Sequence, residues 1–175
     1  LKDREAGFAV EDTASVTKIF MADKNVDDVL LERKGDGWII DGKSRANTRM
    51  VDVLLETMNK VKVKSPVSLA SRDNVLRRMA TTGKKVEVYQ MVYRINLFDR
   101  IKFFQHEKLT RVFYVGDNTQ DNLGTYMLME GAENPYIVYI PHFRGYLSLR
   151  FSPKPDDWKS HVVFQHKLTD IDEVT

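Results

Sequence analysis

Two closely spaced turn signals constrain the opening third of this chain more than any other feature. The segment KGDG occupies residues 34–37, and the pair Asp41-Gly42 follows a few residues later. Because Gly and Asp at this spacing favour tight turns, the β-prone runs around them must be short strands. Those runs are residues 16–22 (VTKIFMA), 27–33 (DDVLLER) and 38–41 (WIID). The pattern predicts a three-stranded meander.

A helix and a strand are predicted next. From Asn47, a good N-cap residue, apolar side chains recur at helical spacing, and Glu56 and Lys60 form an i, i+4 pair on the polar side. The residues expected to face the sheet are Met50, Val51, Leu54, Leu55, Met58 and Val61. In residues 61–67 (VKVKSPV), valines then alternate with lysines, which predicts a half-buried strand with one cationic face that Pro66 ends.

The remainder predicts a second helix and then extended structure. Ser71 is expected to cap the helix and Gly83 to stop it, with Val75, Leu76 and Met79 facing inward. The extended runs that follow are residues 84–98, 101–105, 109–116, 124–131 and 135–141, and the last three are expected to be neighbours joined by hairpin loops. The alternating aromatic residues of residues 100–116 (RIKFFQHEKLTRVFYVG) are expected to be core residues.

These patterns predict an α+β fold of mostly antiparallel sheet with two main helices. A strand-strand-strand-helix-strand unit (residues 1–66) is followed by a second α+β unit with a helix and a β-meander (residues 67–160), and we expect the two to share one core. Residues 161–175 are interpreted as the start of a further repeat, because four positions of the first strand region recur there. The recurring pairs are Phe8 with Phe164, Thr13 with Thr169, Val16 with Ile171 and Ile19 with Val174.

Composition limits the class of protein. The 175 residues are 42% hydrophobic and 30% charged, which is ordinary for a globular protein. No apolar run approaches the roughly 20 residues of a membrane helix, and the N-terminus lacks the layout of a signal peptide. Because the chain begins at Leu1, we expect it to be a soluble piece of a longer protein. The absence of cysteine excludes disulfides, thiolate metal sites and cysteine nucleophiles.

Positive charge is concentrated in the middle of the chain. Residues 60–111 carry 13 basic and 4 acidic side chains, whereas the segments on either side are net acidic. A candidate basic surface comprises Lys60, Lys62, Lys64, Arg77, Arg78, Lys84 and Lys85, with Arg72 beside it. Such a surface could meet anionic headgroups, or it could be a solvated face without a ligand. Nucleic acid is not expected, since the glycine-containing pattern of an RNA-recognition strand is missing.

The most polar loop of the chain lies in VGDNTQDNLGTYMLMEG, residues 115–131. An EF-hand loop counted from Asp117 would need Gly at its sixth position and Glu at its twelfth, but these are Asn122 and Leu128. A hairpin loop whose side chains bond their own backbone is the favoured interpretation, and a looser calcium site stays open. The alternative is a partner-contact loop formed by Asp117, Asn118, Gln120, Asp121 and Asn122.

No catalytic pattern is found. Ser in a G-x-S-x-G elbow, a phosphate-binding glycine loop and the two-histidine motif of zinc proteases are all missing. The histidines are scattered and are expected at the surface: His106, His142, His161 and His166. We therefore expect no enzymatic activity and no cofactor or metal.

Several segments together resemble a known family. They are GWIIDG (residues 37–42), the helix around VDVLLETM, the strand VKVKSPV, and the hairpin of residues 112–141. The chain from about Phe8 to Thr175 resembles the bacterial domain-of-unknown-function family 4340. The resemblance implies an α+β domain on the outer, periplasmic side of the cytoplasmic membrane, often behind an N-terminal anchor, with relatives in auxiliary components of gliding-motility exporters. It carries over no catalytic residues.

The sequence thus predicts a non-catalytic envelope domain that acts as a protein-interaction or accessory module of a membrane-anchored protein. Its expected partners are proteins of the cell envelope, with an anionic membrane surface as a further expectation. Two alternatives stay open, namely a module that binds an anionic surface or polymer and an undetected metal-dependent hydrolase.

Overall fold

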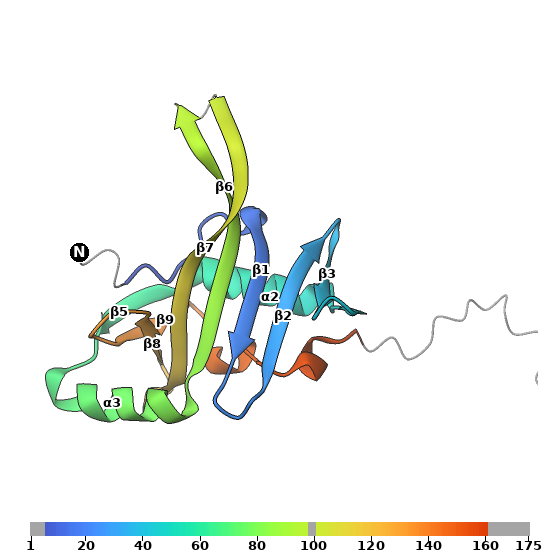
Figure 1. Cartoon of the computed structure of the whole chain (residues 1–175). Coiled ribbons are helices and arrows are strands. Elements are labelled where there is room, and N and C mark those ends of the chain that lie inside the picture. The colour runs from blue at the N-terminus through green and yellow to red at the C-terminus, as the bar shows by residue number, and fades with distance from the viewer. Residues whose placement is uncertain (1–5, 98–100, 161–175) are drawn as a thin grey trace, which may run out of the picture.

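A computed structural model describes residues 6–97 and 101–160 (Figure 1). Within these residues the chain has two α-helices and a nine-stranded antiparallel sheet, and strands account for 42% of the structure. The predicted α+β class is confirmed. The sheet order is β4-β3-β2-β1-β6-β7-β8-β9-β5, so that neighbours in the sheet are mostly neighbours in the chain.

The N-terminal meander is confirmed. Strand β1 (Val16–Ala22) pairs with β2 (Asp28–Lys34), which pairs with β3 (Gly37–Ile40). A two-residue strand, β4 (Ser44–Arg45), then closes this side of the sheet. A short 3-10 turn, η1 (Thr13–Ser15), leads into β1 and is capped by the Asp12 side chain.

Helix α2 (Thr48–Lys60) begins where the sequence predicts, because the Asn47 side chain accepts the Arg49 backbone N–H. The predicted pair of Glu56 and Lys60 is also present. One assignment is wrong: Met50 is 41% exposed, since it lies in the first turn at the margin of the apolar stripe. The helix residues that the core does bury are Val51, Leu54, Leu55, Thr57 and Met58.

Helix α3 (Leu69–Thr82) starts earlier than predicted. Its N-cap is Ser68 rather than Ser71, and its first turn shows no apolar pattern because Leu69 is 81% exposed. Val75 and Met79 are buried as expected, in a small cluster separate from the main core, and the helix ends at Gly83. Between the helices, β5 (Lys62–Pro66) pairs with β9 and forms the other edge of the sheet.

The second half contains two long strands. Strand β6 (Lys84–Leu97) pairs with β7 (Ile101–Asn118), and β8 (Thr125–Met129) and β9 (Tyr136–Tyr139) follow as predicted. The predicted division of β7 into runs 101–105 and 109–116 is wrong, since one strand includes both. Two 3-10 turns, η2 (Leu147–Arg150) and η3 (Pro155–Trp158), complete the described chain.

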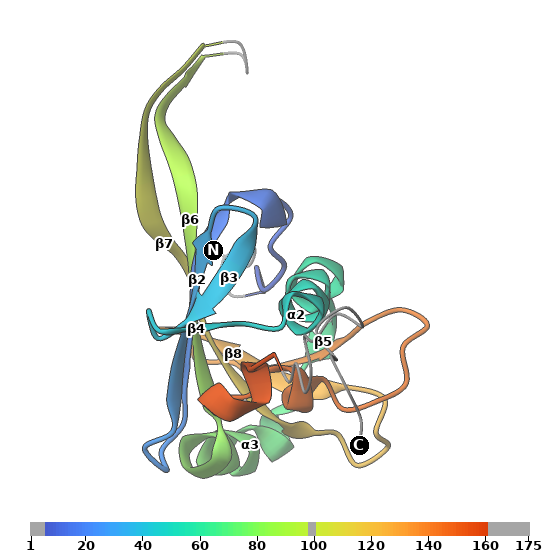
Figure 2. The ribbon, with the colours of Figure 1, turned by 90° about the vertical axis from the view of Figure 1, so that its right-hand side faces the viewer.

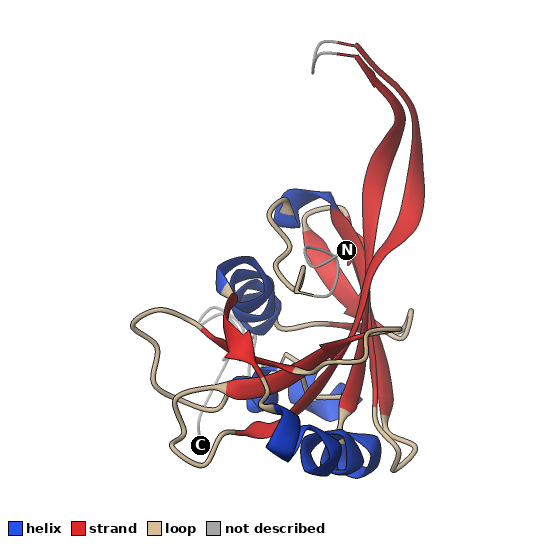
Figure 3. Cartoon of the chain, turned by 90° about the vertical axis from the view of Figure 1, so that its left-hand side faces the viewer, coloured by secondary structure: helices blue, strands red, loops and turns tan. Residues whose placement is uncertain are grey.

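The distal parts of β6 and β7 project from the body (Figures 1 and 2). Figure 3 shows them as a pair of strands that extends beyond the other strands of the sheet. We define the arm as residues 91–97 of β6 and 101–109 of β7. At about 3.3 Å per residue, the β6 part of the arm spans about 20 Å.

The main core joins the first and last thirds of the chain. Phe113 of β7 is fully buried and makes edge-to-face contacts with Phe8 and Phe151, at ring centroid distances of 6.2 and 5.9 Å. Trp158, also buried, donates its indole N–H to the Ser152 carbonyl. Residues of both predicted units, 1–66 and 67–160, contribute to this core. The division into those units stays a prediction, and the proposed repeat at 161–175 lies outside the described residues.

Phe113→Ala should lower the free energy of unfolding by about 3–5 kcal/mol, because it removes a ring from a packed interior and leaves a cavity. The control is Leu149→Ala in η2, where the side chain is 71% exposed and the change should stay within about 0.5 kcal/mol. Urea unfolding followed by circular dichroism measures both. Equal losses for the two variants would contradict the described core.

Candidate interaction site

The polar loop between β7 and β8 is organised around Thr119. Its side chain is buried, and its hydroxyl oxygen accepts the Gly124 backbone N–H at 3.0 Å and also contacts the Asp121 carboxylate. Asp121 in turn accepts the Leu123 N–H at 3.0 Å. The hydrogen bond from Thr119, followed by that from Leu123, lowers the pKa of Asp121. These contacts are those of a side-chain-stabilised turn.

The other loop residues have different surroundings. Asn118 accepts a hydrogen bond from the Thr125 hydroxyl at 3.1 Å. Gln120 and Asn122 are exposed, and Asn122 adopts a left-handed backbone (φ 56°), which Asn tolerates better than most residues. The described residues hold no group of three His, Cys, Asp or Glu side chains that could bind a metal ion. Partner contact through residues 117–122 stays a prediction.

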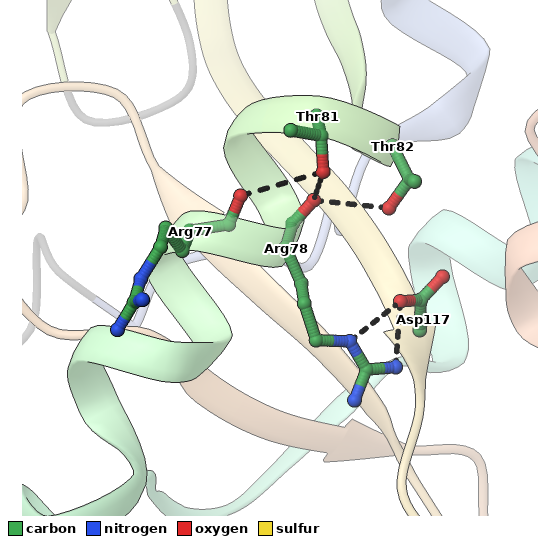
Figure 4. Close-up of polar contacts among 5 residues, drawn as sticks. All are labelled: Arg77, Arg78, Thr81, Thr82 and Asp117. Atoms are coloured by element: carbon green, nitrogen blue, oxygen red, sulfur yellow. Dashed lines mark hydrogen bonds and ion pairs between the residues drawn. The ribbon is translucent and has the colours of Figure 1, made fainter.

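One ion pair joins the two sets of candidate residues. Arg78 of α3 donates from Nη2 and Nε to the same carboxylate oxygen of Asp117, at 2.7 and 3.2 Å (Figure 4). The hydroxyls of Thr81 and Thr82 donate to the Arg78 backbone carbonyl in the same helix. Because both charged side chains are about half exposed, the pair contributes about 1 kcal/mol at most. It links α3 to the end of β7.

The candidate basic residues do not form one uncommitted surface. Lys60 pairs with Glu56, and Lys85 lies 2.9 Å from Glu87, whose hydrogen bond raises the pKa of the lysine. Lys84 is half-buried and donates to the Ser148 carbonyl at 2.7 Å, and burial lowers its pKa. The remaining cations, Lys62 and Lys64 on β5 and Arg77 on α3, are exposed.

The lysines of β5 also have a structural explanation. Strand β5 is an edge strand, and its exposed residues are Lys62, Lys64 and Pro66. Natural edge strands use lysine and proline to prevent pairing with the edges of other molecules, because proline lacks a donor and stacked lysines repel. The cationic face that the sequence predicted is therefore typical of a protected edge.

The arm is a feature that the sequence analysis missed. Strand β1 pairs with β6 only as far as Gln90, and β8 pairs with β7 only from Phe113 onward. Beyond these points the described residues of β6 and β7 pair only with each other. Exposed apolar side chains lie on this ribbon: Tyr93 and Leu109 are each 41% exposed and Phe104 is 71% exposed. The expectation that the aromatic residues of β7 are all core residues is wrong at Phe104.

The base of the arm is fixed to β1. The Glu107 carboxylate accepts hydrogen bonds from the Lys18 ammonium at 2.8 Å and the Thr17 hydroxyl at 2.7 Å. The bond from Lys18 is the main cause that lowers the pKa of Glu107. The Gln90 side chain donates to the Asp12 carbonyl and to the Ser15 hydroxyl. These contacts attach the base of the arm to β1 and to the turn that precedes it.

The backbone of β7 is irregular at both ends of the exposed run. Phe104 has φ 58°, which is uncommon for a bulky residue, and the pairing register shifts next to Thr110. A left-handed residue and a bulge both turn a strand and re-aim its side chains. The sequence signal for this region was the polar run QHEK (residues 105–108), which interrupts the alternation and marks a strand without a buried face.

The histidine predictions hold where they can be examined. His106 on the arm and His142 after β9 are exposed, whereas His161 and His166 lie outside the described residues.

Hollows occur beside α2 and α3. One of 970 Å³ is lined by Asp36, Arg45, Asn47, Arg49 and Lys159 among others, and one of 450 Å³ lies against Leu76, Met79, Tyr114 and Leu128.

Comparison with protein-family models, curated proteins and solved structures found no match to this chain. The resemblance to the domain-of-unknown-function family 4340 therefore stays a proposal. In the part of the chain that the structure describes, no helix has the length and apolar character needed to cross a membrane.

Thr119→Val should destabilise the protein by about 1–3 kcal/mol, because it leaves the buried Gly124 N–H without its acceptor while preserving side-chain shape. Gln120→Ala, one residue along and exposed, is the control and should change stability by no more than about 0.5 kcal/mol. Thermal and urea unfolding measure the difference. A neutral Thr119→Val would show that the hydrogen bonds of this turn do not organise the loop.

Proposed function

We propose that this chain is a non-catalytic protein-interaction module and that the arm is the part that contacts its partner. The observation that carries the proposal is a ribbon whose described residues pair only with each other and whose surface includes apolar side chains: Phe104 is 71% exposed, and Tyr93 and Leu109 are each 41% exposed. Isolated two-stranded ribbons are at best marginally stable in water. Apolar side chains gathered on an exposed surface are typical of interaction sites.

A partner would bury apolar side chains of the arm that the body of the domain leaves exposed. Burying a Phe or Leu side chain contributes about 1.5–3 kcal/mol relative to leaving it exposed. Aromatic side chains are also enriched among the residues that dominate binding energy. The fixed base at Glu107 and Lys18 would keep the arm oriented before binding, so that less conformational freedom is lost.

The cellular setting that we propose follows from the family resemblance alone. It is the periplasmic side of the cytoplasmic membrane, in a protein anchored by an N-terminal segment and associated with a transport or gliding-motility system. The partner would then be another envelope protein.

The alternative functions have weaker support. For binding to an anionic surface, Lys62, Lys64 and Arg77 are the exposed candidates, but the two lysines are explained by protection of the β5 edge. For a metal-dependent hydrolase, none of the observed contacts favours a site.

Site-specific crosslinking tests the proposal. Phe104 is replaced by photoreactive benzoylphenylalanine in the full chain, expressed in its native cells, and the same replacement is made at Leu69, an apolar residue of α3 that is 81% exposed. Irradiation should produce one discrete crosslinked species from position 104 and little from position 69. The species should disappear when Leu109→Ser and Tyr93→Ser are added. Equal crosslinking from both positions would contradict the proposal.

A further inference from the structure

We infer that the partner binds by strand addition: an extended, acidic segment of another protein pairs with the outer edge of β7 at residues 105–109. This inference rests on the proposed function and specifies the chemistry of the partner.

The outer edge of β7 has unused backbone groups. In an antiparallel ladder, each strand directs alternate N–H and C=O pairs toward either side. One side of β7 pairs with β6 throughout, whereas pairing with β8 starts at Phe113 and a single bond from Glu130 N–H reaches the Val112 carbonyl. Residues 105–109 lie between the left-handed Phe104 and the bulge next to Thr110. The backbone N–H and C=O groups that they direct away from β6 pair with no other strand of the described chain.

Strands β4 and β5 at the two ends of the sheet are less suited to strand addition. Strand β4 has only two residues, and β5 carries Lys62, Lys64 and Pro66. The outer edge of β6 leaves β1 next to η1, where the Asp12 carbonyl and the Ser15 hydroxyl accept hydrogen bonds from the Gln90 side chain. The β7 edge has no proline and presents Leu109 at 41% exposure. Peptides that add to a sheet edge use main-chain hydrogen bonds for affinity and side chains for specificity.

The charge of the arm selects an acidic partner. Register places Val92 opposite His106 and Gln90 opposite Lys108, so that His106, Lys108 and Arg94 share one face of the ribbon. The one carboxylate of the run 104–109, Glu107, already pairs with Lys18. Within the described residues no salt bridge involves Lys108 or Arg94, so the uncommitted charge is positive.

A second copy of the chain fits this edge poorly. Two arms pairing symmetrically through β7 would bring the same cationic face alongside itself, and like charges on neighbouring strands are destabilising. A strand that alternates apolar and acidic residues would instead place carboxylates on the face of His106 and Lys108. Its apolar side chains would lie on the opposite face, beside Leu109.

The test uses a synthetic, end-blocked peptide of about six residues in which valine and glutamate alternate. Hydrogen exchange of the full chain is followed by NMR with and without the peptide. With the peptide at about ten times its Kd, outward-facing amides within residues 105–109 should exchange about tenfold more slowly. The effect should weaken as salt is raised.

Two control peptides isolate the two parts of the inference. A valine–lysine peptide tests charge, and a valine–glutamate peptide methylated on alternate backbone nitrogens tests main-chain pairing. Neither should protect residues 105–109. The double variant Arg94→Glu with Lys108→Glu should abolish the effect, whereas Lys62→Glu with Lys64→Glu on the β5 edge should leave it unchanged.

Three results of the peptide experiment would overturn the inference: no protection by the valine–glutamate peptide, equal protection by either control peptide, or protection along β5 instead.

Since the chain has no cysteine, His106→Cys provides a further check, and rapid disulfide-linked dimers under mild oxidation would identify a second copy as the occupant. If the peptide fails while crosslinking at position 104 persists, strand addition is wrong but the proposed interaction module stands.

Discussion

The antiparallel pairing of β6 with β7 is the constraint on which the rest of the structure depends. These two strands lie at the centre of the sheet, with β1 on the outer side of β6 and β8 on the outer side of β7. Their proximal halves carry fully buried side chains such as Val86, Val88 and Phe113. Pairing with β1 ends at Gln90 of β6, and pairing with β8 begins only at Phe113 of β7. The same pair of strands is therefore a core element at one end and an exposed ribbon at the other.

The two ends of the pair differ in what stabilises them. The proximal half gains burial on the sheet face and hydrogen bonds on both edges, whereas the arm has only its internal ladder and the contacts at its base. The edge of β5 shows the arrangement that prevents pairing with other molecules, with two lysines and a proline. The corresponding stretch of β7, residues 105–109, lacks a proline and exposes one apolar side chain, Leu109, which leaves this edge open to the strand addition that we propose.

Much of the fold could be predicted because it depends on local signals. The bounds of β1, the Asn47 cap and the β7–β8 loop all follow from neighbouring residues. Helix α3 was misplaced because Leu69 is apolar but exposed, so that its first turn has no periodic signal. The arm was missed for a related reason: a ribbon without a buried face has no alternation, so residues 106–108 were left between two separate predicted runs. Pairings between distant segments, such as β5 with β9 or Arg78 with Asp117, leave no local trace in the sequence.

Native-state hydrogen exchange of the isolated chain tests the central claim most directly. If the arm is stabilised only by its own ladder, its amides should exchange through local openings that cost no more than about 2 kcal/mol, and the boundary should fall near Gln90 and Phe113. Amides of residues 85–90 and 113–118 should instead exchange with free energies close to that of global unfolding. Equal protection of the arm and of the central strands in a monomeric sample would contradict this account.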